Sequence, residues 1–191
     1  MWTSDKGHEY TIAKGYDMLR NKGEWIQWQG LVWDKFTIPK HSFLTWIYFH
    51  KGLNTNEKLH KLGISDVDTC GICGTGSQSF THLFFDCEYS SRVISLLGSR
   101  IGEIFPHHGT IEWRKKLTGS GTRKRIINAL YNACIYYIWR QCNLCKHELT
   151  LLHPNKLVTL LIKEVTQRIM SVPNQMGARD RDLLDRMRNC Y

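Results

Sequence analysis

The stretch Cys70-Gly-Ile-Cys73, followed by His82 and Cys87, has the spacing C-x2-C-x8-H-x4-C. Two cysteines three residues apart on a tight turn can bind one metal ion from the same side, and the histidine and third cysteine can complete a tetrahedron. Zn²⁺ prefers four nitrogen and sulfur ligands in this geometry, and a site closed by four protein ligands is structural rather than catalytic. The stretch therefore predicts one structural zinc ion held by Cys70, Cys73, His82 and Cys87.

The residues around the first cysteine pair fit a metal-binding turn. Gly71 and Gly74 flank the pair, where such a turn needs positive φ or bare backbone N–H groups. Turn-forming residues lead into it over 66–69. The alternative interpretation is that the cysteines are small core side chains and that His82 begins a helix. A catalytic zinc site is a further alternative, which needs an open coordination position and a nearby general base.

His82 and Cys87 constrain the local backbone. They lie five residues apart, which is about 140° around a regular α-helix. Both side chains cannot easily reach one ion from such a helix. We therefore predict a distorted turn between Phe84 and Cys87.

Length and composition indicate a globular chain with its own core. The 191 residues suit one domain, or one domain with a helical extension, and 42% apolar residues are typical of globular proteins. The chain has seven Trp residues and an aromatic fraction of 12%, and we expect many of these rings in the core. The net charge of +9 and the pI near 9.3 favour polyanionic partners, nucleic acid first.

The cysteine usage bears on the cellular compartment. Three of the seven cysteines belong to the predicted zinc site, and the others show no disulfide framework. No apolar run follows Met1 as in a secretory signal, and the apolar runs are shorter than the ~20 residues of a membrane span. We therefore expect a reducing intracellular compartment and no membrane partner.

A second C-x2-C pair, Cys142 and Cys145, falls within a long helical pattern, and no turn glycine accompanies it. We expect buried or half-buried thiols here rather than a second zinc site.

Apolar residues recur with helical spacing through most of the chain, and no strand-like alternation of any length is visible. The sequence therefore predicts an all-α or mostly α fold organised around the zinc knot, with a long C-terminal helix pair. The expected helices cover 10–21, 24–36, 39–51, 55–62, 89–102, 123–149 and 155–171. In the third of these, the apolar stripe expected to face the core is Phe43, Trp46, Ile47 and His50.

The pattern divides the chain into three expected parts. Residues 1–106 form a zinc-binding helical domain with the knot at 66–90, and residues 107–175 form a helical extension packed on it. Residues 176–191 are expected to form a tail that is either a frayed helix or disordered.

Basic side chains cluster in two segments. Residues 35–61 contain five lysines and one acid, and residues 114–125 contain six basic residues and no acid. A basic turn at a helix N-terminus suits phosphate contacts, whereas the alternative for both segments is an ordinary solvated surface. The candidate nucleic-acid contacts are Lys35, Lys40, Lys51, Lys58, Lys61, Arg114, Lys115, Lys116, Arg123, Lys124 and Arg125.

The assembled pattern resembles the zinc-binding domain of reverse transcriptases from plant LINE-type (non-LTR) retrotransposons. The residues that carry this resemblance are Trp2, Gly7, Tyr16, Leu19, Trp28, Trp33, Pro39, Lys40, Phe43, Trp46, Leu53, Thr55, Leu59, Gly63, Cys70, Cys73, His82, Leu83, Phe84 and Cys87. The stretch Ile138-Trp139-Arg140-x-x-Asn143 is similar to the region downstream of that domain. Cys142, where a basic residue is more usual, and the tail match the family loosely.

The resemblance implies a domain C-terminal to a polymerase, which helps that enzyme to hold template RNA or target DNA. It also implies a structural metal on the same four residues and, if it holds, a nuclear location. No polymerase carboxylate pair or P-loop accompanies these residues. We therefore expect a non-catalytic module that binds RNA or DNA through basic residues and takes no small-molecule substrate. The alternative is a structural domain that docks on a polymerase or on a host partner.

Overall fold

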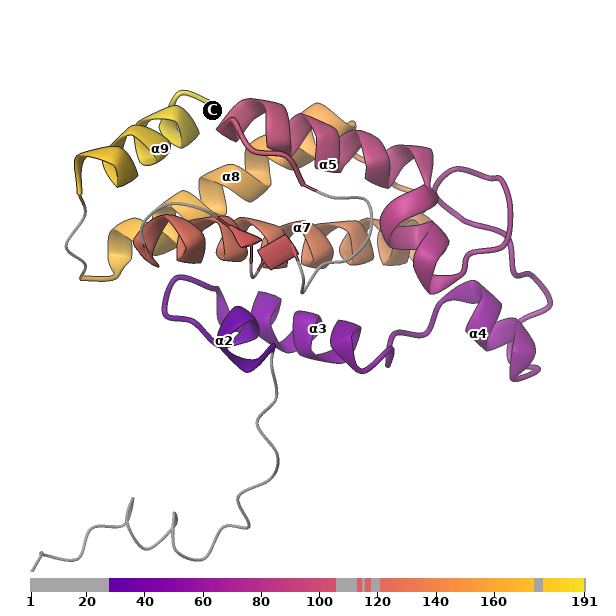
Figure 1. The fold of residues 1–191 in the computed structure, drawn as a ribbon. Coiled ribbons are helices and arrows are strands. Elements are labelled where there is room, and N and C mark those ends of the chain that lie inside the picture. The colour runs from indigo at the N-terminus through magenta and orange to yellow at the C-terminus, as the bar shows by residue number, and fades with distance from the viewer. Residues whose placement is uncertain (1–27, 106–112, 115, 118–120, 174–176, 191) are drawn as a thin grey trace, which may run out of the picture.

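Helix α7 (Gly121–Glu148) is the central element of the computed structural model, which describes residues 28–105, 113–114, 116–117, 121–173 and 177–190. It lies between α3 on one side and α5 and α8 on the other (Figure 1). The bounds of these three helices are Pro39–Phe49, Glu88–Ile101 and Pro154–Ser171. The shorter elements are α2 (Gln29–Val32), α4 (Asn56–Lys61), the π-helix η1 (His82–Asp86) and α9 (Ala178–Arg188).

Helices α5 and α8 form because their apolar residues recur on one face and their ends carry suitable stop and start residues, whereas the central α7 is buried on all sides over 126–135. In α8, Leu157, Leu161 and Ile169 are fully buried, as the helical period requires. Pro154 opens this helix at a position where a missing N–H costs nothing. Gly102 ends α5 with φ of 70°, a left-handed conformation that glycine adopts without steric cost.

The predicted fold class is confirmed. In the part of the chain that the structure describes, the regular elements are helices, and Thr69 and Ser77 form an isolated β-bridge rather than a strand. The long helices α5, α7 and α8 fall within a few residues of their predicted ranges. The predicted helix at 10–21 and the predicted boundary at 106–107 lie outside the described residues.

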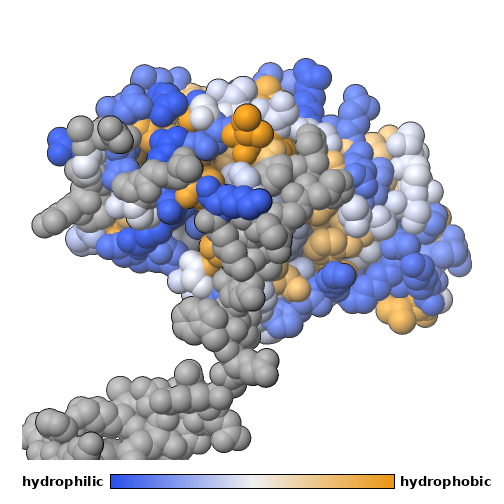
Figure 2. All heavy atoms as spheres, in the orientation of Figure 1, coloured by the Kyte–Doolittle hydropathy of each residue, from blue (hydrophilic) through white to orange (hydrophobic). Residues whose placement is uncertain are grey.

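The surface is mostly hydrophilic on the face shown in Figure 2. Hydrophilic residues dominate around α4 at the right, and apolar residues occur in separate groups. No helix among the described residues is both long and apolar enough to span a bilayer.

The predicted orientation of α3 is wrong for three of the four residues of its apolar stripe, whereas the fourth, Ile47, is half-buried and packs against the core. Phe43 is 55% exposed and Trp46 is 38% exposed, and His50 is exposed as well. The buried residues of α3 are instead His41, Ser42, Thr45 and Tyr48. Ser42 Oγ donates a hydrogen bond to the carbonyl oxygen of Val32 at 2.8 Å, so this polar group is satisfied in the interior.

The predicted helix over 24–36 is shorter in the structure, where its described part contains only α2. Phe36 is fully buried, as expected for a core ring, whereas Trp33 is 51% exposed. The loop after α2 is held by Asp34, whose carboxylate accepts a hydrogen bond from the Phe36 backbone N–H at 2.8 Å. An aspartate side chain that binds the backbone two residues ahead favours a turn over a continuing helix.

The C-terminal segment is helical, which is one of its two expected forms, but the helix is packed against the core rather than frayed. Residues 178–188 form α9, which packs against α5, α7 and α8. Its apolar side chains Leu183 and Met187 are fully buried. The two residues lie four apart on one helical face, and their burial holds α9 against the core. The many charged residues of this segment made these two apolar positions hard to recognise in the sequence.

His41 makes stability depend on pH. Its ring is fully buried against Tyr136, with the ring centroids 4.5 Å apart, and its Nε2 lies 3.2 Å from Glu164 Oε2. Burial lowers the pKa of His41 from 6.5 to about 4. The unfolded chain therefore binds this proton at a higher pH than the folded chain does.

We expect the free energy of unfolding to fall by roughly 1 kcal/mol per pH unit as the pH drops from 6.5 towards 4. His41→Phe removes the titrating group and is expected to flatten this slope. Urea denaturation of both proteins across this pH range measures the difference, with the zinc content of each determined at every pH because acid releases zinc from its ligands. Equal slopes for the two proteins would contradict the assignment to His41.

Candidate metal centre

The first half of the site is the turn that carries Cys70 and Cys73. The Gly74 N–H donates to the Cys70 carbonyl at 2.8 Å, and the Cys70 N–H donates to the Gly76 carbonyl at 2.9 Å. Gly74 and Gly76 have φ of 72° and 64°, which side chains with a Cβ rarely tolerate. The glycines therefore allow the chain to fold back so that both thiols face the same side.

The second half is the π-helix η1, which carries His82 and is followed by Cys87. The Cys87 N–H donates to the His82 carbonyl at 2.7 Å, and Ser79 Oγ accepts a hydrogen bond from the His82 N–H at 2.9 Å. A π-turn spans five residues between donor and acceptor, so it brings these two side chains closer together than a regular α-helix would. The predicted distortion is confirmed, and it includes the whole segment His82–Asp86.

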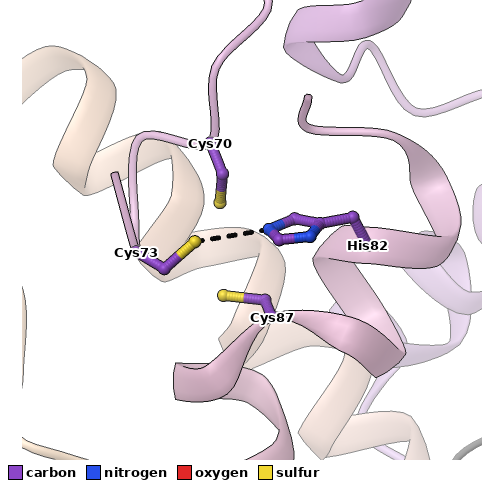
Figure 3. A group of neighbouring side chains, drawn as sticks. All are labelled: Cys70, Cys73, His82 and Cys87. Carbon is purple, nitrogen blue, oxygen red and sulfur yellow. Dashed lines mark hydrogen bonds between the residues drawn. The ribbon is translucent and has the colours of Figure 1, made fainter. Parts of the chain in front are cut away.

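The structure brings together the four side chains that the sequence predicted as ligands. One ligand atom from each of Cys70, Cys73, His82 and Cys87 lies within 4.8 Å of the other three. Figure 3 shows the three thiols and the imidazole pointing toward one another. Cys73 Sγ and His82 Nε2 are 3.4 Å apart. Tetrahedral zinc would place neighbouring ligand atoms about 3.5–3.8 Å apart. The Cys73–His82 pair is already near this spacing, and the wider pairs would have to close by at most about 1 Å.

Burial and electrostatics in the cluster favour metal binding. Cys70 and Cys87 are fully buried, and Cys73 and His82 are half-buried. A hydrogen bond with the Cys87 thiol lowers the pKa of Cys70, and the same contact raises the pKa of Cys87. The thiolate is the form of cysteine that binds metal, so Cys70 is suited to be a ligand at neutral pH.

Gln78 is a residue of this site that the sequence reasoning missed. Its side chain is 1% exposed, and its Nε2 donates to Cys70 Sγ at 3.6 Å. Its Oε1 accepts from the Asn56 N–H at 3.2 Å and from the Cys142 thiol at 3.5 Å. One amide thus connects a ligand to α4 and to α7, and such hydrogen bonds orient metal ligands. The only sequence signal was an amide between Cys73 and His82, which is also common in exposed turns.

Helix α4 is fixed to the same turn. Thr55 caps it by accepting a hydrogen bond from the Lys58 N–H. Asn56 Nδ2 donates to the Thr69 carbonyl at 2.8 Å, and the Glu57 N–H donates to the Gln78 carbonyl at 3.4 Å. The metal-binding turn therefore determines where α4 and its lysines lie.

The second C-x2-C pair lies within α7. Cys142 is 4% exposed and Cys145 is half-buried, and burial raises the pKa of Cys142 to about 12. Both thiols are free, as expected for buried or half-buried cysteines. Among the described residues, the side chains that lie close enough together to hold a metal ion are Cys70, Cys73, His82 and Cys87, and this group does not include Cys142 or Cys145.

The lysines of the first basic segment lie at the surface with different partners. Lys40 Nζ pairs with Glu164 at 2.7 Å and Lys61 Nζ pairs with Glu57 at 2.6 Å. Lys35 Nζ donates to the Pro173 carbonyl at 3.3 Å. Lys51 is exposed and Lys58 is half-buried.

The second basic segment is less accessible than expected. Arg114 is 3% exposed, and it donates to Asn132 Oδ1 at 2.8 Å, so it is a core residue and not a phosphate contact. Arg123 pairs with Glu103, and Arg125 pairs with Asp34 at 2.6 Å. Lys116 is exposed, Lys124 is half-buried, and Lys115 lies outside the described residues.

Comparisons with known proteins agree with this site. Residues 10–93 match the family described as zinc-binding in reverse transcriptase. An uncharacterized mitochondrial protein of Arabidopsis thaliana is 30% identical over 71 residues, which are 36% of this chain and 50% of that protein. The chain thus spans about half the length of this curated relative. No solved structure shows a significant match.

The family match includes the whole cluster from Cys70 to Cys87. It confirms the resemblance that the sequence indicated. Residues 10–93 are therefore similar to a zinc-binding domain that is associated with reverse transcriptases.

Replacement of Gln78 by Leu is expected to lower the affinity for zinc by about 10- to 100-fold, because the Cys70 thiolate loses its outer hydrogen bond. Competition with a chromophoric chelator measures this change. Gln78→Glu is the matched control for the Oε1 contacts, because it keeps an acceptor for the Asn56 N–H but loses the donor to sulfur. Wild-type affinity in Gln78→Leu would contradict this role.

Proposed function

We propose that this chain is a non-catalytic module that binds one structural zinc ion and holds RNA or DNA for a reverse transcriptase. The observation that carries the proposal is the Cys₃His cluster within 4.8 Å, which lies inside the segment matched to a reverse-transcriptase zinc-binding family. Zinc bound there supplies a fourfold cross-link between two pieces of backbone. Cys70, Cys73, His82 and Cys87 would each donate one ligand atom.

The donor set supports a structural role for this ion. Three thiolates and one imidazole complete a tetrahedron, whereas catalytic zinc keeps a position for water or substrate. The described side chains around the cluster add Gln78, which contacts Cys70 through its amide. An amide is not a general base, so the immediate surroundings are suited to orienting ligands.

Nucleic-acid binding is supported by charge and by the placement of α4. The chain carries a net charge of +9, and α4 presents Lys58 and Lys61 from an element fixed to the metal-binding turn. Lys61 pairs with Glu57 on the surface, and such exposed pairs are weak enough to exchange for phosphate. The zinc would thus hold the shape while lysines outside the metal centre contact phosphates.

The alternative function is docking on a polymerase domain or on a host protein. It is favoured by the ion pairs of Lys40, Arg123 and Arg125 and by the burial of Arg114. These contacts reduce the number of cations available to a polyanion. A reducing nuclear compartment is part of the proposal, and the Arabidopsis relative is named as mitochondrial.

The test is the salt dependence of binding to single-stranded RNA, duplex DNA and an RNA–DNA hybrid. Lys58→Ala with Lys61→Ala is expected to weaken binding several-fold at about 50 mM salt. For a single strand, it is expected to reduce the slope of log K against log salt by about 1.4, because two phosphate contacts are lost. Fluorescence anisotropy of the zinc-loaded chain measures both quantities.

Lys156→Ala with Lys163→Ala is the matched control, since it removes the same charge from exposed positions of α8. Equal losses for the two double variants would show that only net charge matters. The absence of measurable binding by the wild-type chain at about 50 mM salt would refute the nucleic-acid proposal in favour of docking.

A further inference from the structure

An aromatic row lies on the outer face of α3, and we define it by Phe43, Trp46, His50 and the neighbouring Trp28. The ring centroids of Phe43 and Trp46 are 5.9 Å apart, those of Trp46 and His50 are 4.7 Å apart, and those of His50 and Trp28 are 5.2 Å apart. Phe43 and Trp46 are 55% and 38% exposed, and His50 is also exposed. Large rings in continuous contact at the surface indicate a binding site more strongly than single exposed rings do.

The rings of the row are held in place before any partner binds. Trp28 stacks on Phe49 with the centroids 5.4 Å apart and an angle of 4° between the ring planes. His50 Nδ1 donates to the Trp46 carbonyl at 2.8 Å, which fixes the imidazole. Side chains that are already ordered lose little entropy on binding, so this surface is suited to a planar ligand.

Charge around the row favours an anionic ligand. Residues 35–56 contain no aspartate or glutamate. Lys51 follows His50 directly and is exposed, and Lys40 lies one turn before Phe43 with 49% of its side chain exposed. The Lys40 ammonium pairs with Glu164 of α8 and lies over the ring of Tyr136, so Lys51 is the exposed cation that adjoins the row in the sequence.

From these contacts we infer that the aromatic row is a stacking surface for the unpaired bases of single-stranded nucleic acid. The inference rests on the proposed nucleic-acid function. It adds that the aromatic row of α3 contacts the bases, whereas lysines contact the phosphates. Bases stack on aromatic side chains irrespective of sequence, while nearby cations follow the phosphates. The distance from Phe43 to His50 along the helix is about 10 Å, which is enough for two or three bases.

The composition of the row favours bases over a protein partner. A protein-binding hot spot is an apolar centre enclosed by a rim that excludes water. The aromatic row instead contains the polar imidazole of His50, and the exposed Lys51 follows that residue directly. Aromatic rings next to a cation are typical of single-strand binding surfaces.

The experiment compares two fluorescent probes of equal length and charge with the zinc-loaded full chain. One probe is an oligothymidylate of about 15 nucleotides, and the other carries abasic residues in place of its central bases. Phe43→Ala with Trp46→Ala is expected to weaken binding of the oligothymidylate about tenfold or more. It is expected to leave the salt slope unchanged, because no charge is removed, and to leave binding of the abasic probe unchanged.

Two variants serve as controls. Ile104→Ala removes an apolar side chain that is 87% exposed outside the row, and it is expected to bind both probes as the wild type does. Phe43→Tyr with Trp46→Phe keeps two rings in the row and is expected to retain binding of the oligothymidylate. Far-UV circular dichroism and zinc content verify that each variant is folded and loaded.

The outcomes separate this inference from the proposed function. Unchanged oligothymidylate binding by the Phe43→Ala, Trp46→Ala variant would overturn the inference alone, provided that the Lys58 and Lys61 substitutions still weaken binding. Equal affinity of the wild type for the two probes would also overturn it. No binding of either probe by the wild type would overturn both proposals, and the row would then be a candidate for protein docking.

Discussion

Four side chains from two separate pieces of backbone have to reach one point, and this requirement shapes the structure around the knot. A regular helix would place His82 and Cys87 about 140° apart. The π-turn, closed by the hydrogen bond from the Cys87 N–H to the His82 carbonyl, removes that separation. Cys87 is also the N-cap of α5. The ligand cluster therefore fixes the start of a helix that packs on α8 and α9.

The ligand cluster is also connected to distant parts of the fold by the side chain of Gln78. Its amide contacts Cys70, the start of α4 and Cys142 of α7, so the metal-binding turn is joined to both the surface and the core. In the proposed function, zinc bound by the four ligands would hold these elements in place, and the surfaces proposed to bind nucleic acid lie outside the metal centre. Lysines of α4 would meet phosphates, and the aromatic row of α3 would meet bases. The residues that would hold the fold through zinc are thus different from the residues proposed to bind nucleic acid.

Local patterns in the sequence predicted the features that depend on nearby residues. Cysteine spacing predicted the ligand cluster, the five-residue separation predicted the distorted turn, and apolar periodicity predicted α5, α7 and α8. Features that depend on distant partners were missed or misjudged. Ser42 is buried because the Val32 carbonyl accepts its hydrogen bond, and Arg114 is buried because Asn132 accepts from it. Neither partner is visible in the local pattern, so Phe43 and Trp46 of α3 were predicted to face the core and Arg114 was predicted at the surface.

The central claim is that the four ligands close one structural zinc site. Zinc K-edge X-ray absorption of the loaded chain tests it most directly, because it counts the ligand atoms and their distances. We expect three sulfur atoms at about 2.3 Å and one nitrogen atom at about 2.0 Å from a single zinc ion. A spectrum that requires an oxygen ligand, or fewer than three sulfur atoms, would contradict the closed site formed by Cys70, Cys73, His82 and Cys87.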